Sequence, residues 1–420
     1  MISVDQALQI VLDNVAPLGI ERVHILEALT RVLAEEIHSP RDIPGFDNSA
    51  MDGYAVRAAD IRAASESNPV KLKVLETVGA GAMPSVRIGA GQAVRTMTGA
   101  PIAEGADAIV PVERTRGTET EVEIMATAEP HTFVRPRGED LKRGELVISA
   151  GKALSASDLG MLASLNRSMV DVYRRPRVAI VATGDELVDV DTVPTGAQVI
   201  NSSAYALGAA IREAGGEPIM LKVARDLREE VRARLAEALA FDVVLTTGGV
   251  SVGEFDHVKL VLDELGLRQL FHGVAQRPGR PLKFGTIGGK PIFGLPGNPV
   301  STMVCFYLYV RPALRRMTMR SDSGLPRVTV RCATDIAKAA NLTEFVRVTL
   351  ARRDGEIYAT PTGNQSSGVL SSLSRAHGLL IGPAAERVLK TGSQAAVLLL
   401  ETGAAAEAEA YFEERRRISN

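Results

Sequence analysis

Between residues 175 and 320, short apolar stretches alternate with helical patterns. Strands are predicted at 177–182, 218–224, 241–246 and 290–295. Helices are predicted between them at 205–214, 228–240 and 257–265. Because strands that alternate with helices form parallel sheets covered by helices, this stretch predicts an α/β domain with a doubly wound parallel sheet.

The flanking segments differ from this domain. Residues 2–39 have helical spacing, with a repeat of the pattern at 26–37, and Ser3 and Gln6 form a capping box at its start. Residues 151–165 are predicted to be helical again. Short β-type runs predict two small β-domains, one in each flank. These runs are 71–74, 122–125, 328–332, 345–351 and 395–400.

The composition excludes several classes of protein. The 420 residues include 48 Lys and Arg against 50 Asp and Glu, a balance that argues against a general nucleic-acid binder. The 2 cysteines and 6 histidines lack metal-binding spacing, so neither a disulfide framework nor a zinc site is expected. Cys305 lies in the longest apolar run, 303–310, and is expected to be inert core. That run is far shorter than the about 20 residues of a membrane span. The N-terminus is unlike a signal peptide, and we expect a cytoplasmic protein.

Each predicted strand of the α/β domain is followed by a loop that is rich in glycine or carboxylates, at the edge where open parallel sheets bind ligands. Glycine lets the backbone approach a phosphate closely, and a helix that begins at Pro299 offers N–H groups to an anion. Each loop by itself is equally compatible with a tight turn that binds nothing, but together they favour a nucleotide or phosphate site. The residues concerned are Gly248, Gly249, Ser251, Gly297, Asn298 and Ser301.

Arg277 and Arg280 lie three residues apart in a turn flanked by prolines, between two of these loops. Planar arginine side chains suit phosphate or another oxyanion. The alternative is an ordinary exposed turn with solvated charges.

Three carboxylates, Glu186, Asp226 and Asp256, are expected at the same sheet edge. Carboxylates beside a phosphate site would repel the ligand unless a cation lies between them, and Mg²⁺ binds both carboxylate and phosphate oxygens. We therefore expect Mg²⁺ at Asp226 and Asp256. The alternative for a single aspartate at a strand end is a helix cap, which is the expectation for Asp185.

The N-terminal half contains three motifs in which polar turn residues surround apolar anchors. They are PGFDNSAMDGYA at 44–55, MTGAP at 97–101 and RPRGED at 135–140. A solvated linker would not need Phe46, Met51 and Tyr54, so these motifs are candidate functional segments. The alternative is turn chemistry within a small β-domain.

These motifs, followed by ATGDEL, TTGGVSVGEFD, RPGRP and GLPGNPVS, resemble the molybdopterin molybdenumtransferases. These are the bacterial MoeA proteins, related to the E domain of gephyrin and its plant homologue. The resemblance covers about residues 1–400. It implies that the protein inserts molybdate into the dithiolene of adenylylated molybdopterin with Mg²⁺ or a similar ion, and that it releases AMP and molybdenum cofactor.

The resemblance also implies a homodimer with four domains per subunit. The implied domains are a helical linker domain of residues 1–39 and 141–174, an inserted β-rich domain of 40–140, the α/β molybdopterin-binding domain of 175–320, and a C-terminal β-barrel of 321–402, followed by a tail of 403–420. In the family, the active site lies between the α/β domain of one subunit and the inserted domain of the other.

Site residues follow from the resemblance position by position. The family's functional acidic and hydroxyl positions match Asp52, Thr98, Asp140, Glu186, Asp226 and Asp256. Its basic and oxyanion-binding positions match Arg135, Arg277, Arg280, Ser301, Arg347 and Ser367. Arg277 and Arg280 replace a pair that is lysine in many members. The usual His-Gln-Gly-Ser is Asn-Gln-Ser-Ser at 364–367, so either Ser366 or Ser367 can be the oxyanion-facing serine.

Three other interpretations stay open. The α/β domain also resembles the adenylyltransferase that makes adenylylated molybdopterin, although the additional N-terminal motifs favour the molybdenumtransferase. A non-enzymatic scaffold is a second alternative, and tungstate in place of molybdate is a third. The expected partners are a second copy of the chain, the molybdopterin adenylyltransferase and the apoenzymes that receive the cofactor.

Overall fold

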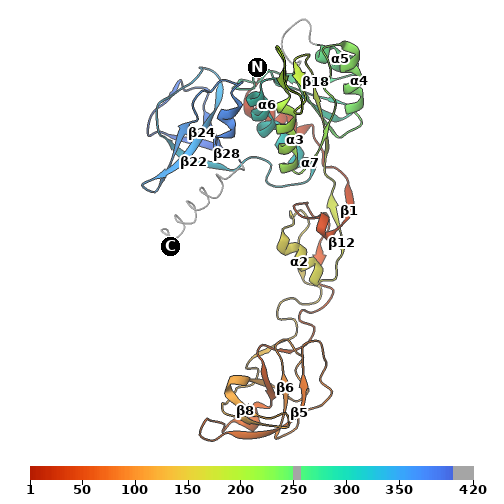
Figure 1. Cartoon of the computed structure of the whole chain (residues 1–420), viewed down its shortest axis with the longest axis vertical. Helices are drawn as coiled ribbons and strands as arrows, with labels where there is room; N and C mark the ends of the chain where they lie inside the picture. Colours follow the sequence, from red (N-terminus) through yellow and green to blue (C-terminus); the bar gives the residue numbers. More distant parts are fainter. Residues whose placement is uncertain (249–256, 401–420) are drawn as a thin grey trace. The chain divides into compact units, whose positions relative to one another are not determined.

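The computed structural model describes residues 1–248 and 257–400. The chain forms two compact units, which can be followed by colour in Figure 1 and are described separately here. The larger unit contains Met1–Ala34, Gly151–Ser155 and the described residues from Met169 onward. The smaller unit contains Glu35–Ala150 and Ala156–Ser168.

The larger unit is built on a six-stranded sheet with the order β16-β13-β17-β21-β20-β18. The first four strands are parallel, as predicted. They are β16 (Glu217–Met220), β13 (Arg177–Ala182), β17 (Val243–Thr247) and β21 (Lys290–Leu295). The two others, β20 (Lys283–Ile287) and β18 (Arg268–His272), extend the sheet in antiparallel pairing and were not predicted.

Helices cover both faces of this sheet, which confirms the doubly wound prediction. Val178 and Ile180 of β13 contribute to one core, and Ala179 and Val181 to the other. A strand buried on both faces is apolar throughout, which is why β13 could be read from the sequence. The first face is covered by α3 (Ser202–Glu213), α6 (Pro299–Cys305) and α7 (Arg311–Met317), and the second by α4 (Arg228–Ala238) and α5 (His257–Glu264).

The first helix, α1 (Val4–Asp13), begins with the predicted capping box of Ser3 and Gln6. Its buried residues Ala7 and Val11 belong to the first core of the α/β sheet. There α1 packs against α7 and the π-helical turn η4 (Phe306–Val310).

The helix predicted at 26–37 is wrong. Strand β1 (Ile20–His24) pairs with β12 (Met169–Tyr173), the short 3₁₀ turn η1 (Ile25–Glu27) follows, and β2 (Ile37–His38) begins the smaller unit. The apolar spacing resembled a helix, but Leu26 is 75% exposed and does not join a core. Pairing with a distant strand overrides local helical spacing.

The C-terminal part of the larger unit is a closed five-stranded barrel. Its strands follow the order β24-β25-β22-β28-β26, and β26 pairs again with β24. They are β22 (Arg327–Cys332), β24 (Thr343–Arg353), β25 (Glu356–Pro361), β26 (Gly378–Gly382) and β28 (Gln394–Leu399). Three of them contain the runs predicted from the sequence, so the second β-domain is confirmed. The tail expected at 403–420 lies outside the described residues.

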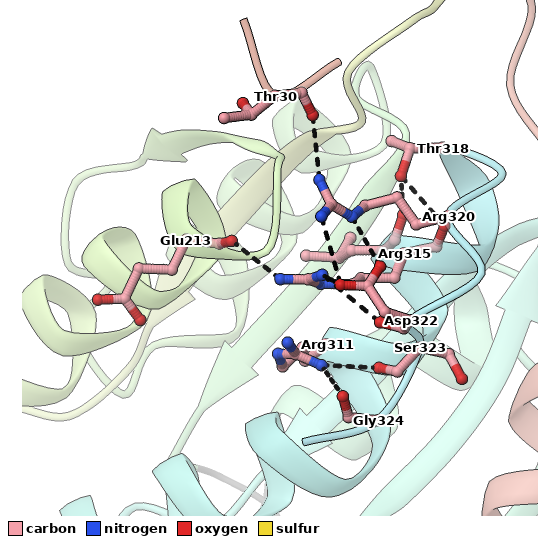
Figure 2. Close-up of polar contacts among 10 residues, drawn as sticks. Thr30, Glu213, Arg311, Arg315, Thr318, Arg320, Asp322, Ser323 and Gly324 are labelled. Carbon is pink, nitrogen blue, oxygen red and sulfur yellow. Dashed lines mark hydrogen bonds and ion pairs between the residues drawn. The ribbon is translucent and has the colours of Figure 1, made fainter. Parts of the chain in front are cut away.

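Figure 2 shows three arginines of one region: Arg311 at the start of α7, Arg315 in its last turn, and Arg320 after it, near Thr30 of the N-terminal segment. Arg315 is buried and pairs with Asp322, and Arg320 donates to the same carboxylate and to the carbonyl oxygen of Thr30 at 3.0 Å. Arg311 donates to the carbonyl oxygen of Ser323 at 2.9 Å. Asp322 therefore links two cations of this cluster.

The smaller unit has its own six-stranded sheet, with the order β7-β4-β6-β5-β9-β8. The strands are β4 (Gly53–Val56), β5 (Val70–Val78), β6 (Gln92–Thr96), β7 (Ala108–Pro111), β8 (Thr115–Gly117) and β9 (Glu121–Ile124). The runs predicted at 71–74 and 122–125 lie in β5 and β9. The unit also contains β2, which pairs with β11 (Leu146–Ile148), and the helix α2 (Ala156–Ser164).

The remaining short elements lie mostly in connections. They are β3 (Asn48–Ser49), η2 (Ala58–Ile61), η3 (Val112–Arg114), β10 (Val134–Arg135), β14 (Leu187–Val188), β15 (Val199–Ile200), β19 (Gln276–Arg277), β23 (Ile336–Ala337), α8 (Leu370–Ser374) and β27 (Val388–Leu389). None of the helices within the described ranges has the length and apolar content that a membrane crossing requires.

Candidate functional site

The loops after β13 and β16 meet at the carboxyl edge of the parallel strands. Thr183 bridges Ala224, and the backbone N–H of Asp226 donates to Oδ1 of Asp185 at 3.1 Å. Asp185 thus holds the two loops together. The helix cap expected for it is wrong, because the strand β14 and not a helix follows it. The Glu186 carboxylate lies over Gly184, where an added Cβ would be 2.5 Å from Oε2. Both Glu186 and Asp226 are exposed at this edge.

The two glycine loops predicted to bind phosphate also meet at this edge. Gly248 has φ +87°, and a Cβ added to it would lie 2.8 Å from the carbonyl oxygen of Thr183. A Cβ added to Gly297 would lie 3.6 Å from the Cα of Gly248. Glycine is therefore required at 248 by conformation and by space, and the loops after β17 and β21 are in contact.

The first turn of α6 differs in one respect from the prediction. Pro299 begins the helix and Asn298 precedes it, as expected. However, the N–H of Val300 donates to the carbonyl oxygen of Ser367 at 3.2 Å. This N–H therefore binds a group of the protein and is not available to an anion. Ser301 is buried and adjacent to it. The contact brings Ser367 of the barrel to the start of a helix of the α/β domain.

The RPGRP turn packs on the same helix. A Cβ added to Gly279 would lie 2.5 Å from Sγ of Cys305 and 3.5 Å from the carbonyl oxygen of Ser301. Cys305 Sγ donates to the carbonyl oxygen of Gly279 at 3.5 Å, and burial raises the pKa of its thiol. Cys305 is thus buried core, as predicted, and it supports the turn. Arg277 and Arg280 themselves are exposed.

The turn also joins the barrel. β19, which ends at Arg277, pairs in parallel with the start of β24, and Arg277 Nε lies 3.8 Å from Oε1 of Glu344. Beneath the turn, buried Gln276 donates to the carbonyl oxygen of Pro278 at 3.0 Å and accepts from the hydroxyl of Tyr309.

Arg347 of β24 is 1% exposed, and its guanidinium is held by several fixed acceptors. Its Nε donates to the hydroxyl of Ser372 at 3.1 Å, and one terminal nitrogen donates to the carbonyl oxygens of Ser366 at 3.1 Å and Asn364 at 3.3 Å. Burial, together with the charge of Arg277, lowers the pKa of Arg347, while Glu344 opposes this change. Arg347 is thus a buried cation whose orientation is fixed by the 364–366 loop.

These contacts bring together the predicted oxyanion residues of the larger unit. The RPGRP turn lies on Ser301, Ser367 lies on Val300, and Arg347 is anchored to the loop that contains Ser367. Ser366 is exposed and uses its carbonyl oxygen to bind Arg347, while the carbonyl oxygen of Ser367 binds α6. Both contacts use main-chain oxygens, and the one from Ser367 reaches the first turn of α6.

In the smaller unit, Asp52 and Thr98 form a specific pair. Oδ1 of Asp52 accepts from the backbone N–H of Thr98 at 2.7 Å and from its hydroxyl at 2.8 Å. These two bonds, the backbone one first, lower the pKa of Asp52. An exposed carboxylate is thereby held ionised in a fixed orientation.

The three N-terminal motifs converge on β3. Asn48 pairs with Arg135 on one side and bridges Pro101 on the other. The N–H of Asp140 donates to the carbonyl oxygen of Ile43 at 3.0 Å, next to the start of the first motif. The structure therefore brings the segments of Asp52, Thr98, Arg135 and Asp140 to one region of the smaller unit.

Three predicted site residues, Gly249, Ser251 and Asp256, lie outside the described residues. Within residues 1–248 and 257–400, no group of three or more His, Cys, Asp and Glu is arranged to hold a metal ion. Of the two predicted magnesium ligands only Asp226 is described, and it shares its sheet edge with Glu186.

Sequence reasoning missed the residues that position this site. Gln276 and Tyr309 support the RPGRP turn. Glu344 lies beside Arg277, and Ser372 accepts a hydrogen bond from Arg347. Gln276 directly precedes the RPGRP motif, which was a usable signal. Glu344 and Ser372 belong to no motif, and only the barrel topology reveals them.

Comparison with known proteins covers nearly the whole chain. Residues 2–166 match the family model "MoeA N-terminal region (domain I and II)", 179–316 match "Probable molybdopterin binding domain", and 329–400 match "MoeA C-terminal region (domain IV)". A molybdopterin molybdenumtransferase of Nostoc sp. is 35% identical over 386 residues, which are 90% of this chain and 88% of that protein. The Bacillus subtilis protein of the same name is 34% identical over 385 residues, 90% of each chain.

A solved structure agrees with these relatives. The molybdopterin biosynthesis MoeA protein from Pyrococcus horikosii superposes with a TM-score of 0.81 at 35% identity, over 95% of this chain and 99% of that one. The order of the motifs, the architecture and these matches lead to one conclusion: the chain belongs to the MoeA family of molybdopterin molybdenumtransferases.

Proposed function

We propose that this protein is a molybdenumtransferase that inserts molybdate into adenylylated molybdopterin and releases AMP and molybdenum cofactor. The observation that supports the proposal is that the RPGRP turn, the first turn of α6 and the 364–367 loop contact one another. These segments contain or anchor Arg277, Arg280, Ser301, Arg347 and Ser367. Molybdate is a tetrahedral dianion, and guanidinium and hydroxyl donors suit such an oxyanion.

The protein's own residues have separable roles in this proposal. Arg277 and Arg280, exposed on a turn that rests on buried Cys305, approach the oxyanion. Arg347 supplies a fixed buried charge, and Ser301 and Ser367 supply hydroxyl groups. The loops of Gly248 and Gly297, which contact each other at the sheet edge, are proposed to bring backbone N–H groups close to a phosphate group.

The reaction itself exchanges one bond at phosphorus. A molybdate oxygen or a water molecule attacks the adenylate phosphorus, the phosphoanhydride bond breaks, and AMP leaves with the attacking oxygen. The pterin keeps its own phosphate. Two Mo–S bonds form at the dithiolene while two Mo–O bonds break. One displaced oxygen leaves as water with the two thiol protons, and the other leaves in AMP when molybdate is the attacker, or as a second water with two solvent protons when water is. Molybdenum keeps its oxidation state, so no electrons are transferred. We propose no covalent enzyme intermediate, so trapping an AMP–enzyme adduct would contradict this part.

Mg²⁺ fits the donors at the sheet edge, because it usually binds through one or two carboxylates together with substrate phosphates. Glu186 and Asp226 are exposed carboxylates on two adjoining loops, and we propose them as its described ligands, with Asp256 as the third carboxylate. When bound, Mg²⁺ neutralises phosphate charge and polarises the anhydride. Glu186→Gln and Asp226→Asn should each raise the Mg²⁺ concentration needed for half-maximal AMP release by about tenfold. Asp191→Asn, at an exposed position, is the control.

The first experiment measures AMP release from adenylylated molybdopterin, with and without molybdate and Mg²⁺. Release that requires both, together with formation of active cofactor, is the expected result. Transfer of AMP from ATP to free molybdopterin would instead move the protein to the adenylyltransferase class. Neither activity in folded protein would support a binding or scaffold role, and parallel titrations with molybdate and tungstate separate the two oxyanions.

Arginine variants test the oxyanion pocket directly. Arg277→Ala and Arg280→Ala should each raise the molybdate concentration for half-maximal release by about tenfold, because each removes a charged hydrogen-bond donor. Arg316→Ala, at an exposed position of α7, is the matched control. An unchanged molybdate requirement in both pocket variants would contradict the assignment.

We further propose a cytoplasmic homodimer that receives its substrate from the adenylyltransferase and passes the product to apoenzymes. Light scattering of the full chain tests the dimer, and a mass of one chain at micromolar concentration contradicts it.

A further inference from the structure

The smaller unit contains a pocket of about 400 Å³ whose lining includes none of the residues assigned to the proposed reaction. Its walls come from β7, η3 and the 126–133 loop, and they include Ile109, Pro111, Ala128 and Phe133. Glu113 and Arg114 also line it. This volume and this mixture of apolar walls with a few polar groups are typical of small-molecule sites.

Phe133, in the pocket wall, has an unfavourable backbone conformation. Its φ is +54°, a region that bulky residues rarely adopt, and its side chain is 44% exposed. The loop is fixed directly before Phe133, since the N–H of His131 donates to the carbonyl oxygen of Asp107 at 2.6 Å and the N–H of Ile109 donates to the carbonyl oxygen of Thr132 at 3.0 Å. The fold therefore imposes both strain and exposure on an aromatic ring, a combination that marks functional sites.

The polar groups of the pocket are available to a ligand. Glu113 and Arg114 are both exposed, and in the described part of the chain neither side chain forms an ion pair or hydrogen bond. The two residues are adjacent in η3. They offer the pocket the two acceptor oxygens of a carboxylate and the donors of a guanidinium.

The pocket adjoins the segment of the Asp52–Thr98 pair. The N–H of Val112 donates to the carbonyl oxygen of Asp52 at 3.0 Å, and the N–H of Ala50 donates to the carbonyl oxygen of Phe133 at 2.9 Å. Two walls of the pocket are thus hydrogen-bonded to the backbone on either side of Met51.

We propose that this pocket binds the fused 2-amino-4-oxopyrimidine ring of a pterin, with the ring stacked on Phe133. The 2-amino group and the neighbouring ring N–H are two adjacent donors. Both donate hydrogen bonds to the Glu113 carboxylate. The 4-oxo group accepts from Arg114. Adenine lacks this pair of adjacent donors and does not match Glu113. That this ring is the pterin of the substrate rests on the proposed function. That the ring carries this pattern of donors and acceptors is inferred from the pocket residues alone.

The test measures ring binding without turnover. Saturation-transfer NMR of free pterin with the full chain detects binding at millimolar concentration, and wild-type protein is expected to show saturable transfer. Phe133→Gly removes the ring and relieves the strain at positive φ, so the variant remains folded and weakens pterin binding by about fivefold or more. Glu113→Gln replaces one acceptor oxygen by a donor and weakens binding by about fivefold or more.

Two variants serve as controls. Met83→Ala removes an exposed apolar side chain outside the pocket, and Glu119→Gln neutralises an exposed carboxylate on the β8–β9 turn. Both should bind pterin as the wild type does. Guanosine, which has the same ring edge, should displace pterin, and adenosine should not.

The outcomes separate this inference from the proposed function. No saturation transfer in the wild type, equal binding by Phe133→Gly, or equal displacement by adenosine overturns the pterin pocket. If AMP release is normal while any of these results holds, the function stands and the pocket assignment fails. If pterin binding depends on Phe133 and Glu113 but AMP release is absent, the pocket stands and the function fails.

Discussion

One oxygen of Asp52 accepts hydrogen bonds from both the backbone N–H and the hydroxyl of Thr98, at 2.7 and 2.8 Å. The pKa of Asp52 is lowered by these bonds, the backbone one contributing most. The carboxylate therefore stays ionised at pH values where an ordinary aspartate begins to bind a proton. Its contribution to stability is present above the ordinary pKa and is lost as the pH falls through the lowered one.

Thr98→Val removes the hydroxyl but keeps the backbone donor. We expect the pKa of Asp52 to rise part of the way to its ordinary value, and Thr98→Ser to leave it nearly unchanged. An NMR titration of carboxyl-labelled aspartate measures both shifts. A pKa of Asp52 that is the same in Thr98→Val and Thr98→Ser would show that the hydroxyl bond is unimportant.

Gly248 and Gly266 provide a matched pair for the glycine loop. Both have positive φ, but an added Cβ meets the carbonyl oxygen of Thr183 at 2.8 Å only at Gly248, while nothing lies within 4 Å at Gly266. Gly266→Ala should lower the free energy of unfolding by about 1–2 kcal/mol through backbone strain alone. Gly248→Ala should lower it further and also weaken substrate binding. The free energies of unfolding are measured in urea. Equal losses in the two variants would mean that the loop moves away from the added Cβ without further destabilising the protein.

Arg347→Lys keeps the positive charge but loses the planar donor set. The carbonyl oxygens of Asn364 and Ser366 and the hydroxyl of Ser372 would lose their shared partner, at a cost of about 1–3 kcal/mol in unfolding free energy. The molybdate requirement for AMP release should rise as well. Arg327→Lys, at an exposed position of β22, should change neither quantity, and a similar effect of both substitutions would argue against a specific role for Arg347.

Asp322, which joins Arg315 and Arg320 in Figure 2, should contribute to stability in a pH-dependent way. Burial alone would raise its pKa, but the hydrogen bond from Arg320 and the charge of Arg315 lower it to about 2. The contribution of this carboxylate is thus complete above its ordinary pKa of 3.8 and is lost as the pH falls toward 2.

Asp322→Asn should accordingly lower the urea midpoint at pH 7. The expected loss is about 1 kcal/mol, since solvent screens a carboxylate that is 55% exposed. The difference between wild type and variant should shrink at pH 2.5. A difference that is the same at both pH values would show that packing, and not charge, accounts for the loss.

The parallel strands could be predicted because their burial is visible in the sequence. β13 and β21 were predicted at their observed bounds, since both are continuous apolar runs that end at glycine-rich loops. The antiparallel strands β18 and β20 were missed because they contain polar residues and resemble connecting segments. The 26–37 segment resembles a helix in the sequence because its pairing partners are distant: Val32 bridges Ala153, Leu33 bridges Val172, and Ile37 pairs with Ile148.

The motifs propose the positions of the candidate site residues, but they do not predict how these residues contact one another. The motifs located Arg277, Ser301 and Thr98, yet no local pattern shows that Ser367 binds the first turn of α6 or that Gln276 supports the RPGRP turn. The pocket beside Phe133 left no signal, because its walls come from three short segments and its strain appears only in the backbone angle of one residue.

The pairing of β19 with β24 has a consequence for dissecting the chain. Arg277, Arg280 and Ser301 come from the α/β domain, whereas Arg347 and Ser367 come from the barrel. A fragment that ends before the barrel would lose the strand that pairs with β19 and the carbonyl oxygen of Ser367 that accepts from the N–H of Val300. The proposed oxyanion pocket therefore requires both domains on one chain, and neither domain can be assayed for it alone.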